Sequence, residues 1–173
     1  TISLALTAAE TGLLVFGTLH TNNARKTVDR LIDVFPSDKQ SQIRTMLAAS
    51  LKGVVAQLLC KCDDTQINQD TGSPLFTGRV AVNEVMVSNS AVAAIIREGA
   101  TQKLYDVIIG GKSEGMQFMD EDIFAKLKMG MISPFEAYMK AIDKKRFKEY
   151  LPEDLQELAH SGGGELEGAA SSG

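Results

Sequence analysis

Along this chain, apolar positions at helical spacing alternate with short, nearly continuous apolar runs. A first helix is predicted at residues 2–10, because good helix formers fill it and Thr11 and Gly12 end it. The run LLVFGTL at residues 13–19 lies between turn signals, which predicts a strand buried on both faces, as in a parallel sheet. The polar residues 20–23 follow at the carboxyl end of that strand.

Two amphipathic helices are predicted next. Asn22 or Asn23 caps the first, whose apolar positions recur at i, i+3, i+4 and i+7: Val28, Leu31, Ile32 and Phe35. Ser37 is expected to cap the second, at residues 37–50, in a capping-box pattern with Gln40.

The rest of the chain predicts a hairpin and then helices. Strands are expected at residues 54–59 and 78–87, joined by a long polar loop that contains Gly72 and Pro74. Helices follow at 89–98, 101–109, 116–129 and 134–142. Residues 161–173 lack the apolar content to fold, which predicts a disordered tail.

Composition and charge limit the kinds of partner that the sequence predicts. The net charge of −4, from 18 basic and 22 acidic residues, does not favour a nucleic-acid partner, which needs a basic face. No apolar run approaches the roughly 18 to 20 residues of a membrane span, so no membrane insertion is expected. Cys60 and Cys62 have the spacing of neither a zinc site nor a disulfide framework, which favours two reduced thiols at a strand end.

The strongest local pattern is GTLHTNN at residues 17–23. It places hydroxyls and the imidazole of His20 at the carboxyl end of a predicted buried strand, the edge where ligands bind in open α/β sheets. A single histidine at a strand end is more often structural than catalytic. The other histidine, His160, lies in a region with no packing signal, so no metal site is predicted.

Other catalytic patterns are absent from the sequence. It contains neither a G-x-S-x-G elbow nor a G-x-x-x-x-G-K-[ST] phosphate loop. The letters GGKS at residues 110–113 lie between two predicted helices, which favours a turn that ends a helix.

The sequence of residues 5–36, ALTAAETGLLVFGTLHTNNARKTVDRLIDVFP, resembles the His box of type II/IV secretion ATPases, in particular type IV pilus retraction ATPases. The resemblance continues through the stretches 46–59, 78–86, 104–105, 115–117 and 130–134. It implies an α/β fold class: the distal part of a RecA-like P-loop ATPase domain, followed by a C-terminal helical bundle. The implied division is residues 1–88 for the ATPase core, 89–150 for the helical domain and 151–173 for an extension and tail.

The family resemblance also implies a function. Its members form homohexameric, Mg²⁺- and ATP-dependent motors in the cytoplasm, at the inner face of the cytoplasmic membrane, where they act on a pilus inner-membrane platform protein. Their phosphate loop and Walker B strand precede the His box, so this chain is expected to lack both. The fragment alone is then expected to be inactive and to hold no cofactor by its own ligands.

The resemblance also implies roles for particular residues. His20 corresponds to the His-box histidine, a γ-phosphate contact or sensor, and Thr18 and Thr21 flank it as nucleotide contacts. Asp29 and Arg30 lie on the matched helix, where either a structural salt bridge or a nucleotide contact fits.

Two departures from the family pattern leave alternatives open. Leu13 stands where many members carry a second histidine. The family's AIRNLIRE motif reads AVAAIIRE at residues 91–98, which keeps Ile95, Ile96, Arg97 and Glu98 as a partner or retraction motif but equally allows simple core packing. The alternative functions are a pilus-assembly or type II secretion ATPase, or a non-catalytic interaction module.

Overall fold

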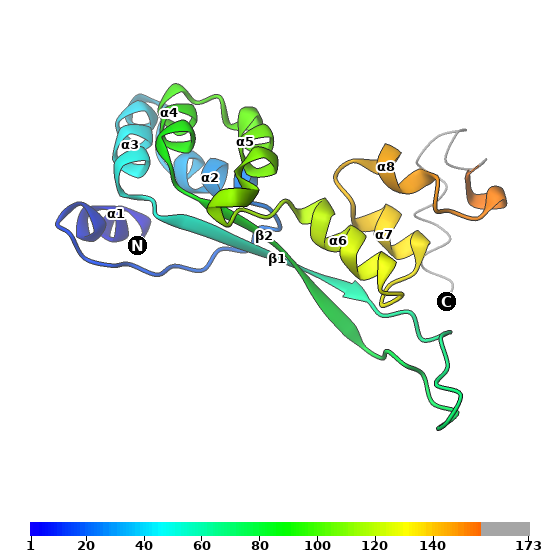
Figure 1. The fold of residues 1–173 in the computed structure, drawn as a ribbon. Helices are drawn as coiled ribbons and strands as arrows, with labels where there is room; N and C mark the ends of the chain where they lie inside the picture. The colour runs from blue at the N-terminus through cyan, green and yellow to red at the C-terminus, as the bar shows by residue number, and fades with distance from the viewer. Residues whose placement is uncertain (157–173) are drawn as a thin grey trace. The chain divides into compact units, whose positions relative to one another are not determined.

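The computed structural model describes residues 1–156, which group into two compact units (Figure 1). Unit 1 comprises Thr1–Leu58 and Val82–Asp122. Unit 2 comprises Leu59–Ala81 and the residues from Ile123 onward. The predicted division at residues 88 and 150 concerns family domains rather than compact units and stays a prediction. The predicted tail at residues 161–173 lies outside the described residues.

The two predicted hairpin strands are present as β1, Gly53–Lys61, and β2, Arg79–Val87. The backbone N–H of Cys62 donates to the Gly78 carbonyl oxygen (3.0 Å), and that of Ser88 donates to the Lys52 carbonyl oxygen (2.9 Å). These bonds, one beyond each end of the ladder, set an antiparallel register in which even-numbered residues of β1 face β2 with their backbone groups.

Unit 1 is built on helices that pack around α3. It contains α1 (Ile2–Glu10), α2 (Ala24–Asp33), α3 (Ser37–Ser50), α4 (Ser90–Glu98) and α5 (Leu104–Gly110), with short 3₁₀ turns at Thr101–Lys103 and Gly111–Glu114. Helix α3 packs against α1, α2 and α4, as Figure 1 shows for α2, α3 and α4. Their apolar faces and Met86 of β2 form one core, whose helical members include Val28, Leu47, Val92, Ile96 and Leu104.

Among the helices α1 to α5 of unit 1, side-chain caps start α2 and α4, whereas α1, α3 and α5 have none. The Asn23 side chain accepts a hydrogen bond from Lys26 N, as predicted, and starts α2. Ser37 does not cap α3: it is the first helical residue, and Pro36 occupies the cap position without a side-chain bond. The Gln40 amide donates instead to the Phe35 carbonyl oxygen, and Pro36 has no backbone N–H from which the Gln40 side-chain oxygen could accept a hydrogen bond.

The predicted strand at residues 13–19 is wrong. This segment has no regular secondary structure, and Leu14 and Phe16 are 74% and 89% exposed. A strand is held by hydrogen bonds to a neighbouring strand, and in the described part of the chain the only sheet is the pair β1–β2. Apolar character alone therefore did not make a strand of this segment.

The two glycines of the GGKS stretch lie where α5 ends, and Gly111 is also required by packing. Gly110 ends α5, and Gly111 begins the 3₁₀ turn that follows. A Cβ added to Gly111 would lie 2.5 Å from the Met116 sulfur. The prediction of a turn that ends a helix is confirmed.

Helix α6, Met119–Lys128, begins three residues later than predicted. Gln117 forms a bridge with Val85 of β2, with N–H to O bonds in both directions (2.8 and 2.9 Å). The backbone N–H and C=O of Gln117 are thus bonded to β2 and cannot join a helix, so α6 starts only after this residue. Residues beyond Asp122 belong to unit 2.

Unit 2 contains the helices α7 (Pro134–Lys140) and α8 (Lys144–Lys148), the second of which was not predicted. Phe124 makes edge-to-face contacts with Phe147 (6.2 Å between centroids) and Tyr150 (5.7 Å). Cys60 and Cys62 are both buried in this unit. Five charged residues of α8 and its start leave little apolar periodicity, which is why the sequence pattern missed this short helix.

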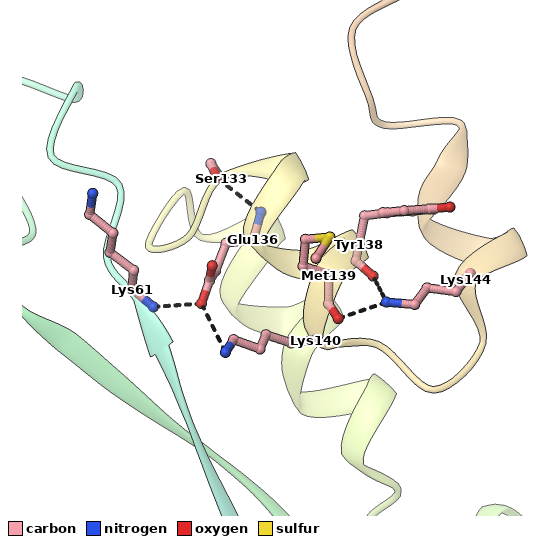
Figure 2. A network of polar contacts seen from close by, with 7 residues as sticks. All are labelled: Lys61, Ser133, Glu136, Tyr138, Met139, Lys140 and Lys144. Carbon is pink, nitrogen blue, oxygen red and sulfur yellow. Dashed lines mark hydrogen bonds and ion pairs between the residues drawn. The ribbon is translucent and has the colours of Figure 1, made fainter. Parts of the chain in front are cut away.

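Polar contacts hold α7 in place (Figure 2). Ser133 caps the helix by accepting a hydrogen bond from Glu136 N, and the Glu136 carboxylate accepts one from Lys61 N at the end of β1 (2.9 Å). At the other end of α7, Lys144 Nζ donates to the carbonyl oxygens of Tyr138 and Met139 (2.6 Å each). A cation at a helix C-terminus complements the helix dipole. Within residues 1–156 no helix is both long enough and apolar enough to cross a membrane.

Candidate functional site

His20 lies in an open hollow on unit 1. Leu19, His20, Thr21 and Asn22 line it from the segment before α2, Lys26 lines it from α2, and Gln57 lines it from β1; its volume is about 530 Å³. A second hollow of about 380 Å³ shares four of these residues and adds Thr18 and Arg30. The structure therefore brings all three predicted nucleotide contacts, Thr18, His20 and Thr21, to one place.

The charge lining these hollows is positive. Lys26 and Arg30 lie four positions apart on α2, at i and i+4, and so lie on one helix face. No carboxylate is among the lining residues of either hollow. Asp29, which the sequence left open for an ion pair, pairs with Arg25 instead (3.6 Å). Arg30 is thus on the hollow side, and an anionic group such as a phosphate would meet two cations there.

A chain of hydrogen bonds fixes Thr21 against α2. Thr27 Oγ1 donates its single proton to the Asn23 carbonyl oxygen (2.9 Å). In the contact between Thr21 Oγ1 and Thr27 Oγ1 (2.7 Å), the Thr21 hydroxyl is therefore the donor. With its proton engaged, Thr21 fixes the backbone next to His20 and lines both hollows, whereas Thr18 is exposed and lines the second hollow.

A buried carboxylate adjoins this segment, and sequence reasoning missed it. Glu84 of β2 is fully buried, and its Oε1 accepts a hydrogen bond from Ala24 N (2.7 Å), the first residue of α2. Burial raises the pKa of Glu84 above its ordinary value; the N–H bonds from Ala24 and Met119 oppose this shift, and the nearby charge of Asp120 adds to it. The sequence did contain a signal for it, because Glu84 is an acidic residue at a position of the predicted strand 78–87 that faces the core.

The residues of the AVAAIIRE stretch divide between core and surface. Ile95 and Ile96 are buried in the core of unit 1, together with Val92. Arg97 and Glu98 are exposed at the end of α4, where Gly99 ends the helix in the left-handed conformation (φ 73°). A partner-binding role of these four residues stays a prediction, and only the two charged side chains are placed to reach a partner from the surface.

Of the lining residues, Lys26 and Gln57 were not predicted. The spacing of Lys26 and Arg30 on the same helix was a readable signal for a basic face, whereas Gln57 comes to the hollow only through the position of β1. Among residues 1–156, no three His, Cys, Asp or Glu side chains are grouped so as to hold a metal ion.

The family described as type II/IV secretion system protein matches residues 1–143. The chain belongs to this family. Over 141 residues it is 44% identical to a twitching motility protein of Neisseria gonorrhoeae and 43% identical to the type IV pilus retractation ATPase PilT of Pseudomonas aeruginosa. Each match covers 82% of this chain, which spans 35% and 38% of the length of these two relatives.

Structural similarity agrees with the sequence matches. A solved structure of the pilus retraction motor PilT with bound ADP superposes with a TM-score of 0.67 at 34% identity, over 84% of this chain and 37% of that one. The type II secretion system protein HxcR of Pseudomonas aeruginosa is more distant, at 30% identity over 134 residues, 70% of this chain and 27% of that protein. The resemblance to pilus retraction ATPases and the predicted α/β fold class of a RecA-like ATPase are confirmed.

Proposed function

We propose that this chain is part of a hexameric, ATP-hydrolysing motor that retracts type IV pili and so powers twitching motility. The motor works with Mg²⁺ in the cytoplasm, at the inner face of the cytoplasmic membrane, against an inner-membrane platform protein of the pilus. The residues described above supply the His-box part of the nucleotide site. The phosphate cradle and the acidic Walker B strand come from sequence outside these 173 residues.

The observation that supports retraction over secretion is the ranking of relatives within one organism. In Pseudomonas aeruginosa the chain is 43% identical to the retractation ATPase PilT but 30% identical to the secretion protein HxcR. That difference of 13 percentage points, over regions of similar length, favours the retraction branch. A pilus-assembly or secretion ATPase remains the alternative function.

The geometry of the hollow fits a role at the γ-phosphate. His20 and Thr18 provide hydrogen-bond donors, and Lys26 and Arg30 provide positive charge. Phosphoryl transfer relies on positioning and on charge stabilisation of the phosphate oxygens rather than on covalent chemistry by the protein. These four side chains thus contact or sense the terminal phosphate, while other parts of the motor hold Mg²⁺ and the attacking water.

A chimeric motor tests this function. Residues 1–143 replace the matching region of the Neisseria gonorrhoeae twitching motility protein, in a strain that lacks its own copy. The chimera should hydrolyse ATP and restore twitching. The matched variant His20→Ala should assemble normally and lose at least about tenfold in turnover, because a transition-state contact is removed.

A second chimera separates the alternatives. The same residues replace the matching region of HxcR, and secretion is measured in place of twitching. If the HxcR chimera restores secretion while the twitching chimera hydrolyses ATP without restoring motility, the retraction function is wrong and a secretion ATPase is the better description.

A further inference from the structure

Glu84 is a fully buried carboxylate whose two oxygens serve two different helices. Oε1 accepts a hydrogen bond from Ala24 N (2.7 Å), and Oε2 accepts one from Met119 N (3.2 Å). The donors lie 60 and 35 residues away in sequence, and all three residues belong to unit 1. A charged or acidic group is rarely buried without a specific set of partners.

Each donor is the first residue of its helix: Ala24 begins α2 and Met119 begins α6. The first N–H groups of a helix have no partner inside the helix, and the helix dipole makes this end positive. The carboxylate of Glu84 satisfies one such group on each helix. On α2 the Asn23 side chain takes Lys26 N, so the two residues share the cap between them.

This carboxylate also fixes the segment that lines the hollow. His20, Thr21 and Asn22 lie directly before the capped start of α2. On the other side, residues 13–19 have no regular structure to hold them. The place of His20 is therefore set from the α2 side, by the Thr21–Thr27 hydrogen bond and by the anchor of Ala24 on Glu84.

We propose that Glu84 is a positioning residue for the His20 hollow: by binding Ala24 N it holds the start of α2, and with it His20, in place on β2. The link to nucleotide chemistry rests on the proposed function of the hollow. The link between Glu84 and the position of α2 does not, and can be tested on the chain itself.

Asp122 offers a matched control. Its Oδ2 accepts a hydrogen bond from Asn83 N (2.9 Å), so it too is a carboxylate that joins β2 to α6. Asp122→Asn thus removes a carboxylate charge next to β2, keeps an amide oxygen that can accept from Asn83 N, and leaves the bond between Ala24 N and Glu84 in place.

The first experiment is amide hydrogen exchange by NMR on the 173-residue chain. Glu84→Gln retains one acceptor oxygen but turns its amide N–H groups toward the other donor, so at least one bond is lost. At least one of the Ala24 and Met119 amides should exchange at least about tenfold faster in Glu84→Gln, and the Ala24 amide should stay within about threefold of the parent chain in Asp122→Asn. Unchanged exchange at both amides in Glu84→Gln, or an equal acceleration at Ala24 in Asp122→Asn, would overturn the proposal.

If Glu84→Gln does not fold, as judged by circular dichroism, Glu84→Asp takes its place. It keeps the charge but is one methylene shorter, so it cannot reach both donors at once. Faster exchange at Ala24 or Met119 supports the positioning role, and unchanged exchange at both sites contradicts it.

The second experiment asks whether Glu84 acts through His20, with ATP turnover of the chimeric motor as the readout. Glu84→Gln should lower turnover about tenfold when His20 is present and less than about twofold in a His20→Ala background, because coupled residues are not additive. An equal loss in both backgrounds would mean that Glu84 is merely structural. If His20→Ala itself has no effect, the proposed function of the hollow fails, while the exchange experiment still decides the positioning role.

Discussion

At the scale of single residues, Glu84 combines burial with hydrogen bonds that favour its charged form. Burial dominates, so its pKa in the folded chain lies above the ordinary value of 4.5. The proton is then held more tightly by the folded than by the unfolded chain. The stabilising contribution of this group is fully present below its ordinary pKa and is lost as pH rises through the folded value.

This gives a pH-dependent prediction. Glu84→Gln does not titrate, so the stability of the parent chain relative to this variant should fall as pH rises from about 4.5 toward neutrality. Asp120 on α6, whose charge also raises the pKa of Glu84, is left unchanged in both proteins. Urea unfolding at a series of pH values measures the difference, and a gap that stays constant or widens with pH would contradict the assigned shift.

The two halves of the IIRE stretch should respond differently to substitution. Ile96→Ala removes a fully buried side chain and should lower the free energy of unfolding by about 2 to 5 kcal/mol. Arg97→Ala removes an exposed one and should change it by less than about 0.5 kcal/mol. Urea unfolding of both variants checks this.

The same pair bears on partner binding. If the motif binds a partner through its exposed charges, Arg97→Ala in the chimeric motor should lose motility while its ATP turnover and stability are retained. Normal motility in that variant would leave core packing as the role of this stretch.

At the scale of elements, residues 13–19 show that an apolar run needs a neighbour to become a strand. Phe16 is 89% exposed, so Phe16→Ser should change the free energy of unfolding of the 173-residue chain by less than about 0.5 kcal/mol. A phenylalanine buried in a sheet would cost about 3 to 5 kcal/mol when truncated. A loss in that higher range by urea unfolding would mean that the segment is packed in solution.

Other elements were predictable because their signals are local. The caps by Asn23 and Asn89 depend on a side chain and a backbone group three residues apart, and both starts were close to prediction. The start of α6 was not, because the bridge between Val85 and Gln117 joins residues 32 positions apart. Long-range pairing of this kind leaves no periodic trace in the sequence.

At the scale of the whole molecule, the 173-residue chain should not turn over ATP by itself. Phosphoryl transfer needs a phosphate cradle, Mg²⁺ and a positioned water, and the sequence contains no G-x-x-x-x-G-K-[ST] loop. Phosphate release from Mg²⁺-ATP should remain at the buffer rate for the chain and for His20→Ala alike. Turnover that depends on both Mg²⁺ and His20 would show that the chain forms a complete active site.

The sequence by itself determined the family, the start of α2 at its asparagine cap and the β-hairpin, and it proposed Thr18, His20 and Thr21 as nucleotide contacts. These follow from the sequences of the motifs and from interactions between residues a few positions apart. Only the tertiary structure decided that residues 13–19 form no strand, that Ile95 and Ile96 pack in the core, and that Lys26, Arg30 and Gln57 line the hollow. It also decided the burial of Glu84 and its hydrogen-bond partners, which lie 60 and 35 residues away. The physical reason is the same in each case: a local pattern can indicate a face, such as the basic face of Lys26 and Arg30, but burial and hydrogen-bond partners are set by segments that are distant in sequence.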